Sequence, residues 1–244
     1  MGNELVQFDS KQYPLLDPTQ KGAQEAILAN LGDQGPGEFD LERVRVPAGG
    51  GTSWTLVGLD GKEREAKELD CVLLMWKNSR AYWKESFDAS GGGVPPSCTS
   101  HDAQFGVGDN GEGEGRRACA DCGQSKFGSA EKGKGQACKQ MKVLFCLMQG
   151  NMLPHALFLP PTSIKEMNTY MLRLASQGLK FCSVVTRLTL EKTKNDGGIT
   201  YSKVKPSMIM KLTPDAAAAA WEMATKLKPA MEQVEIEQSD LQPA

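Results

Sequence analysis

The sequence predicts a mainly β fold with flanking helices, an α+β chain in which a small barrel is interrupted by an inserted loop. Three observations support this prediction. Apolar runs rich in β-branched residues alternate with Gly, Asn and Asp turns, which is typical of strands. Three other segments have the periodicity or composition of helices. Residues 95–140 break the pattern, because they hold four of the seven cysteines and little apolar surface.

The predicted helices have recognisable ends. Ser163 and Glu166 form the pair of a capping box at the start of the second helix. Asp215 is placed to cap the last helix, whose alanine run has high helix propensity. The three predicted helices are Lys21–Leu31, Ile164–Ser176 and 216–227.

The predicted strands surround the cysteine-rich segment on both sides. A turn at Asn195–Gly198 joins the last two strands as a hairpin, and Pro206 indicates that the final strand is bent or lies at a sheet edge. This order of strands and helices is compatible with an OB-like five-stranded barrel. The predicted strands are 41–46, 54–57, Glu68–Lys77, Met141–Met148, 155–159, Phe181–Lys192 and Ile199–Leu212.

The cysteine spacing predicts a zinc site. Cys119 and Cys122 form a CxxC pair that a tight turn can present to one tetrahedral ion, and Cys98 and Cys138 can complete a set of four cysteine ligands. His101 is an alternative fourth ligand, three residues after Cys98. Structural zinc contributes roughly 10 kcal/mol or more of folding free energy to small peptides. This loop has too little apolar surface to fold without such a contribution. The alternatives are free thiols or a redox CxxC, although a thioredoxin-type pair opens a helix.

Charge and cysteine usage suggest the compartment and the class of partner. Residues 116–142 carry seven basic side chains against two acidic ones, while the last sixteen residues carry four acidic and no basic ones. Neither a signal peptide pattern nor a membrane-spanning apolar run is present in the sequence. An odd number of cysteines with a CxxC then predicts a reducing cytoplasm. Cys71, Cys146 and Cys182 lie in apolar runs and are expected in the core.

The segment Pro95–Ser163 carries a family resemblance, through PPxC, CxxC, FGSAxxGKGxACK and LPPTS. It resembles the zinc-containing, OB-fold single-stranded DNA-binding proteins of tailed phages. The resemblance covers about residues 40–212 and implies a bacterial host cytoplasm, metal ligation by the four cysteines, and a role in phage DNA replication and recombination. The acidic C-terminus is similar to tails that dock replication partners, but it lacks a terminal aromatic residue.

Basic and aromatic residues near the cysteines are the candidates for DNA contact. Cations hold phosphates and rings stack on any unpaired base, so the expected binding is sequence-tolerant and sensitive to salt. For each ring the alternative is a place in the core, and for each lysine a solvated surface position. The candidates are Trp54, Arg80, Tyr82, Trp83, Lys84, Arg116, Arg117, Lys126, Phe127, Lys132, Lys134 and Lys139.

Catalysis is not expected, because no complete set of catalytic residues is present. The chain lacks HExxH, and GSAEKGKG does not fit the phosphate-loop pattern. The function expected is binding of single-stranded DNA. The alternative is a zinc-stapled protein adaptor or a transcription or host-takeover factor. The predicted regions are an N-terminal arm and helix (1–40), the first part of the barrel (41–94), the zinc-binding insert (95–140), the rest of the barrel with helices (141–228) and an acidic, mobile C-terminal tail (229–244).

Overall fold

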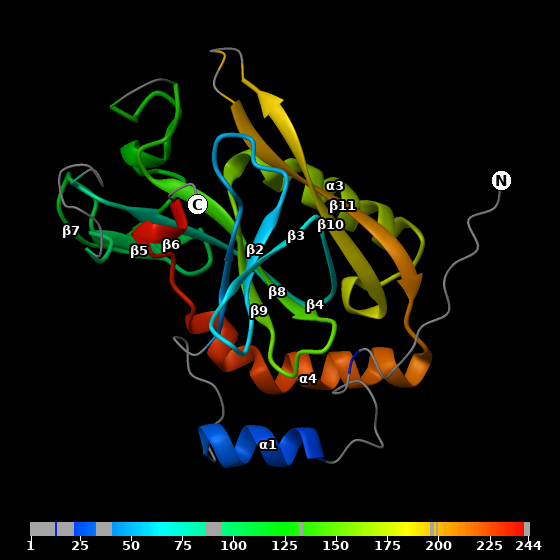
Figure 1. Cartoon of the computed structure of the whole chain (residues 1–244). Helices are drawn as coiled ribbons and strands as arrows, with labels where there is room; N and C mark the ends of the chain where they lie inside the picture. Colours follow the sequence, from blue (N-terminus) through cyan, green and yellow to red (C-terminus); the bar gives the residue numbers. More distant parts are fainter. Residues whose placement is uncertain are drawn as a thin grey trace.

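Strand β4 (Glu68–Tyr82) runs through the centre of a nine-stranded mixed sheet (Figure 1). The structure is a computed structural model that describes residues 13, 22–32, 41–85, 94–131, 134–195, 198 and 200–241. One edge of β4 pairs with β8 along Cys71–Ala81. Its other edge pairs with β10 near the start and with β5 near the end, so the sheet divides along this strand.

Each predicted helix and strand coincides with an observed one, and the differences in these elements lie at the ends. The strands are β1 (Arg43–Arg45), β2 (Trp54–Val57), β3 (Glu63–Ala66), β4, β5 (Cys98–Ser100), β6 (Phe105–Asp109), β7 (Glu114–Ala118), β8 (Lys139–Met148), β9 (His155–Leu159), β10 (Val184–Lys194) and β11 (Thr200–Lys211). The helices are α1 (Gly22–Leu31), α3 (Pro161–Ser176) and α4 (Pro214–Gln233), with short 3-10 turns η3 (Gly123–Ser125), η4 (Phe181–Ser183) and η5 (Gln238–Leu241).

The α+β class is confirmed, and the sheet is open rather than a clearly closed five-stranded barrel. The order is β1-β9-β8-β4-β5-β6-β7, and within the described residues β1, β7 and β11 each pair along one edge only. Strand β1 pairs in parallel with β9, while β2 and β3 form a separate two-stranded sheet. The edge position of Pro206 in β11 agrees with the sequence prediction.

The cysteine-rich insert was expected to be a loop, but its first half extends the sheet. Strands β5, β6 and β7 form an antiparallel set that continues from the C-terminal end of β4. The sequence FGVGD of β6 alternates apolar residues with glycine. This alternation has the two-residue period of a strand and places both apolar side chains on one face. The predicted insert therefore combines three strands with a true loop that follows Ala118.

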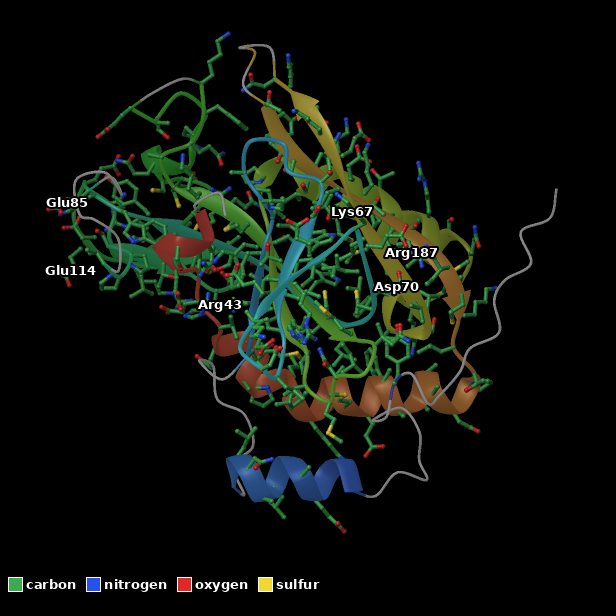
Figure 2. All side chains as sticks on the ribbon, viewed as in Figure 1. Arg43, Lys67, Asp70, Glu85, Glu114 and Arg187 are labelled. Carbon is green, nitrogen blue, oxygen red and sulfur yellow. The ribbon has the colours of Figure 1, made fainter. Side chains whose placement is uncertain are left out.

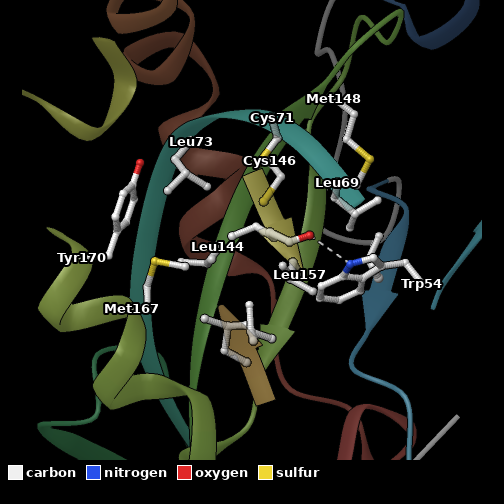
Figure 3. Close-up of a cluster of buried hydrophobic side chains, with 14 of the residues drawn as sticks. Trp54, Leu69, Cys71, Leu73, Leu144, Cys146, Met148, Leu157, Met167 and Tyr170 are labelled. Atoms are coloured by element: carbon white, nitrogen blue, oxygen red, sulfur yellow. Dashed lines mark hydrogen bonds between the residues drawn. The ribbon is translucent and has the colours of Figure 1, made fainter. Parts of the chain in front are cut away.

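Helices α3 and α4 cover opposite faces of the sheet. Leu73 and Leu144 pack with Met167 of α3 in one cluster, which also holds Trp54 (Figure 3). The alternate residues of the same strands, such as Leu74, pack with the small alanine side chains of α4 in a second cluster. Both faces of the central strands are therefore buried, which explains their nearly continuous apolar sequence.

Two predicted helix caps are corrected by the structure. Helix α3 begins at Pro161, where the fixed φ of proline suits the first turn, and Ser163 lies inside it. The Ser163 hydroxyl instead accepts a hydrogen bond of 3.0 Å from the Val204 backbone N–H, tying α3 to β11. Thr213, not Asp215, caps α4 by accepting from Ala216 N at 3.3 Å.

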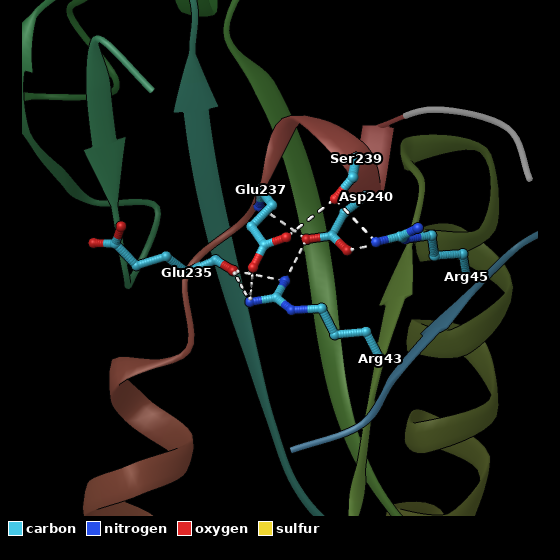
Figure 4. A network of polar contacts seen from close by, with 6 residues as sticks. All are labelled: Arg43, Arg45, Glu235, Glu237, Ser239 and Asp240. Atoms are coloured by element: carbon cyan, nitrogen blue, oxygen red, sulfur yellow. Dashed lines mark hydrogen bonds and ion pairs between the residues drawn. The ribbon is translucent and has the colours of Figure 1, made fainter. Parts of the chain in front are cut away.

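The C-terminal segment is packed, which corrects the expectation of a mobile tail after residue 228. Helix α4 continues through Pro229, and the apolar side chains of Val234 and Ile236 are buried beyond it. Asp240 lies between two arginines of β1, with a carboxylate oxygen 2.6 Å from Arg43 Nη1 and the other 3.5 Å from Arg45 Nε (Figure 4). Glu237 and Asp240 thus bind the chain's own edge strand. Residues 242–244 lie outside the described residues.

The N-terminal arm is described only in part. Tyr13 is 1% exposed and packs into the cluster on the α4 side of the sheet. Helix α1 coincides with the helix predicted over Lys21–Leu31. The remainder of the arm, residues 1–12, 14–21 and 33–40, lies outside the described residues.

Candidate functional site

Four cysteines that are far apart in the sequence line one small cavity. Cys98 comes from β5, Cys119 and Cys122 from the turn after β7, and Cys138 from the residue before β8. The cavity volume is about 10 Å³, which is room for roughly one atom the size of a water oxygen. All of these cysteines are free thiols. The fold therefore brings the four cysteines that the spacing had suggested as a set to the wall of one cavity.

A buried serine holds the CxxC turn in shape. Ser125 Oγ donates towards the backbone carbonyls of Cys119 and Cys122, at 2.5 and 2.8 Å. Its own carbonyl accepts from Gln136 Nε2 at 2.6 Å, and Cys138 N donates to Gln124 O at 2.9 Å. These bonds connect the turn to the returning end of the loop, so Cys138 is brought back beside the CxxC pair.

Two glycines of β6 make room for the cysteines. A Cβ atom added to Gly106 would stand 3.1 Å from Cys98 Sγ and 3.6 Å from Cys119 Sγ. One added to Gly108, whose φ is +117°, would stand 2.2 Å from the backbone oxygen of Ser97. Larger residues at either position would displace the cavity wall, so the glycine-rich composition of this segment has a packing reason.

Arg80 and Arg117, which were predicted to contact phosphates, line the cavity and are half-buried. Arg80 Nη2 donates to Gln140 Oε1 at 2.7 Å, and Arg117 Nη1 donates to Asn110 Oδ1 at 2.5 Å. Asn110 Nδ2 in turn donates to Cys122 Sγ at 3.3 Å. Arg80 Nη1 and Arg117 Nε are buried without a hydrogen-bond partner among the described residues. These guanidinium groups face the thiols and their supports.

The thiols are close enough to influence one another's protonation. Burial raises the pKa of Cys98, and the neighbouring Cys119 and Cys122 raise it further. Burial raises the pKa of Cys138 to about 11, although the positive charge of Arg80 acts in the opposite direction. Within the part of the chain that the structure describes, no three His, Cys, Asp or Glu side chains are placed so as to hold a metal ion. In this arrangement Cys98 and Cys138 favour the protonated thiol.

The alternative ligand His101 lies elsewhere. Its Nε2 is 3.2 Å from a carboxylate oxygen of Glu235, in the segment after α4. The residues that line the cavity include Cys98 but not His101. The placement therefore favours the sulfur of Cys98 over the imidazole as the fourth member of the set.

The predicted stacking rings fall in different environments. Trp54 is wholly buried, and its Nε1 donates to the Leu188 carbonyl at 3.1 Å (Figure 3), so its assignment to DNA contact is corrected to a core role. Trp83 is half-buried and donates from Nε1 to Val94 O at 2.9 Å. Tyr82 is also half-buried and lines the cysteine cavity. None of these three rings is presented openly to solvent.

Several predicted cations already have acceptors within the insert. Lys84 pairs with the carboxylate of Asp109, while Lys126 and Lys139 donate from Nζ to backbone carbonyls. Such contacts between partly exposed groups are weak and exchange readily with other anions. These lysines can therefore still meet phosphates, at the loss of a local hydrogen bond.

The outer surface of the insert carries two exposed rings. Phe127, which was predicted to stack, is 83% exposed and Lys134 is exposed nearby in the sequence. Arg116 lies 4.8 Å from the centroid of Phe105, a ring that the sequence reasoning did not select. Lys132 lies outside the described residues. Figure 2 labels Glu85 and Glu114 on this side of the molecule, so acidic side chains also lie here.

Trp76 is another aromatic residue near the candidate site, and the sequence analysis placed it in a strand without selecting it for DNA contact. It lies in the middle of β4, is 38% exposed, and has Lys142 Nζ 3.5 Å from its ring centroid. Lys142 itself is 1% exposed, and burial lowers its pKa to about 8. The alternation of β4 contained a signal, because Trp76 shares a face with Arg80 and Tyr82, which were selected.

Comparison with protein-family models, curated proteins and solved structures found no match to this chain. Within the described ranges, no helix combines the length and the hydropathy needed to cross a membrane. The case for function therefore depends on the geometry of the insert and on the chemistry of its side chains.

Proposed function

We propose that this protein binds single-stranded DNA without sequence preference, in phage DNA replication or recombination, through a loop that zinc fastens to the sheet. The observation that carries the proposal is the convergence of Cys98, Cys119, Cys122 and Cys138 on one cavity. That cavity anchors a basic loop that presents Phe127 to solvent. The proposal does not require a closed OB-like barrel, because the anchored loop and the adjoining surface supply the contacts.

The donor set supports zinc as the ion. The thiols of four cysteines line one cavity of about 10 Å³, and four cysteine ligands are the donor set of a closed, tetrahedral structural zinc site. The described side chains are not placed to hold an ion, so the proposal requires the thiols to draw together when zinc binds. Zinc lowers the pKa of its thiol ligands, so the protons held on these cysteines would be released on binding. Its contribution would be structural, as a crosslink between β5, the CxxC turn and the start of β8.

Charge balance gives the two cavity arginines a role in the same site. A zinc ion with four thiolates carries a net charge of −2, which is unfavourable in a buried position unless it is neutralised. Arg80 and Arg117 both line the cavity and each retains a buried N–H without a partner in the described structure. Donation from guanidinium groups towards thiolates would satisfy these groups and offset the charge.

Elemental analysis tests the metal. The purified chain is expected to contain about one zinc ion, and Cys119→Ser combined with Cys122→Ser is expected to contain almost none. In that variant, residues 98–138 should exchange amide hydrogens faster, while the central strands keep their protection. Cys182→Ala is the matched control, because Cys182 is buried in the cluster beside α4. Stoichiometric zinc in the double variant would contradict the ligand set.

The chemistry of the loop supports an unpaired strand as the ligand. A solvated phenylalanine ring can stack on any exposed base, and flexible lysines can follow a phosphate chain. Phe127 and Lys134 are exposed on the loop, and Lys126 and Lys139 make only single bonds to carbonyls. Within a duplex both faces of each base are covered, so the ring favours single strands.

Fluorescence anisotropy tests the proposed binding. Labelled oligo-dT should bind far more tightly than a duplex of the same length. Its affinity should fall steeply as salt rises from about 50 to about 500 mM, because counterions are released from several phosphates. Equal affinity for the duplex, or no binding of either, would end the proposal.

Binding without turnover is part of the proposal, as is recruitment of replication or recombination proteins. The acidic residues that such partners would engage include Glu237 and Asp240, which pair with Arg43 of β1. A partner that binds residues 229–244 through these carboxylates must therefore first separate the segment from β1.

A further inference from the structure

A groove separates the cysteine loop from helix α3. Its volume is about 400 Å³, within the range of small-ligand sites. One wall belongs to the loop that the cysteines anchor and the other to a single face of α3, with β8 between them. The residues that line it include Phe127, Gln140, Lys165, Asn168 and Leu172.

The groove has the charge of an anion site. Among the described residues that line it, Lys165 is the one charged side chain, and none is a carboxylate. Glu166, the next residue, pairs instead with two lysines of β11, with Lys203 at 2.7 Å and with Lys205 at 3.5 Å. It therefore does not neutralise Lys165, whose charge is left for a ligand.

The groove also has an apolar rim and a free amide. Phe127 is 83% exposed on the loop side, and Leu172 is 71% exposed on the helix side. The side chain of Asn168 makes no hydrogen bond to the described residues and can serve as both donor and acceptor. Gln140, which also lines the groove, accepts from Arg80 through Oε1, and its amide N–H groups make no hydrogen bond to the described residues. Ring, amides and ammonium form a combination that suits one nucleotide.

Resting on the proposed function, we infer that this groove holds one unpaired nucleotide of the bound strand, with its base on Phe127 and its phosphate at Lys165. The occupant follows from charge and access. A phosphate supplies the anion that Lys165 lacks, and only a base outside a duplex exposes the face that Phe127 can cover. Amide side chains donate and accept, so they tolerate any base edge. Helix α3 thereby becomes part of the interface, which its apolar stripe did not suggest.

Two substitutions at exposed positions test this placement. Phe127→Ala should weaken binding of labelled oligo-dT by about 5-fold to 100-fold, the range for loss of one stacked base. Lys165→Gln should weaken binding at low salt and reduce the slope of log affinity against log salt by roughly 0.7, the value for one phosphate on a single strand. Lys228→Gln is the control, since it removes the same charge from α4 on the other face of the sheet.

Photocrosslinking adds a positional readout. An iodouracil-substituted oligonucleotide should crosslink to the peptide that contains Phe127. If the unmodified protein bound no single strand, the proposed function would fail and this inference with it. If it bound, but Phe127→Ala and Lys165→Gln matched the control and crosslinks formed only outside the groove, the inference alone would be overturned.

Discussion

Gly106 lies directly against Cys98, so that a single added methyl group would stand 3.1 Å from the cysteine sulfur. The backbone of Gly106 is not in the left-handed region, and so the requirement for glycine at this position is one of space. Its neighbour two residues on, Gly108, is constrained by both its φ of +117° and its closeness to Ser97. The cysteine cavity therefore depends on residues that carry no ligand atom.

Gly106→Ala is expected to weaken the cysteine site while leaving the fold intact. The added methyl group must push Cys98 Sγ away by a few tenths of an ångström, which costs about 1–2 kcal/mol in a packed site. Zinc affinity, measured by competition with a chelator, should fall accordingly. Gly135→Ala is the control in the same loop, because its Cβ would meet Ala130 at an ordinary 3.8 Å. Equal zinc affinities for both variants would exclude this role of Gly106.

Trp54→Phe is expected to lower stability without changing DNA affinity. Trp54 Nε1 donates to the carbonyl of Leu188, which stands opposite Pro206, a residue without an N–H to donate. The substitution leaves a buried acceptor unsatisfied and a small cavity, for a loss of about 2–4 kcal/mol. Urea unfolding and anisotropy under conditions where the variant is folded measure the two effects. A large loss of affinity with unchanged stability would restore Trp54 as a stacking residue.

Asp240→Ala is expected to release the C-terminal segment from β1. The carboxylate is fully buried and joins Arg43 and Arg45, and it also accepts from Glu237 N at 2.8 Å. Its removal leaves part of the charge of Arg43 unpaired, which should lower the free energy of unfolding by about 3 kcal/mol. Faster hydrogen exchange over 234–241 is the expected result. Asp215→Ala, at the exposed start of α4, should leave that exchange unchanged.

The buried side chain of Lys142 is expected to make the stability of the fold depend on pH in the alkaline range. Burial lowers its folded pKa to about 8 from an ordinary 10.5. Between these values the unfolded chain binds the extra proton, so the contribution of this residue to stability rises with pH across that window. Below pH 8 the buried charge is unfavourable by an amount on the order of 2–3 kcal/mol.

The comparison with Lys142→Met isolates this contribution. The variant should be more stable than the natural chain at pH 7 and should lose the rise in stability between about pH 8 and pH 10. Urea unfolding at several pH values measures the difference, with Lys228→Met as the exposed control. Parallel pH profiles for the natural chain and Lys142→Met would show that Lys142 does not titrate in this range.

Local sequence signals located the elements well because they act over a few residues. Strand β8 lies where the apolar run Met141–Met148 predicted a strand. Strands β10 and β11 pair as the hairpin that was predicted around Asn195–Gly198. The same signals failed for β5, β6 and β7. Glycine weakens the strand propensity of β6 and β7, and all three short strands depend on pairing with β4 or with one another. Strand pairing was also not readable, as β1 joins the distant β9.

For the candidate site, the sequence by itself singled out Cys119 and Cys122 as a pair, because two cysteines separated by two residues can meet within one turn of the chain. The choice between Cys98 and His101, the inward direction of Arg80 and the burial of Trp54 were decided only by tertiary structure. Each of these depends on which face of a strand meets which neighbour, and that is set by pairings between residues far apart in the chain. The groove beside α3 has the same origin, since its two walls are joined by contacts that no local pattern contains.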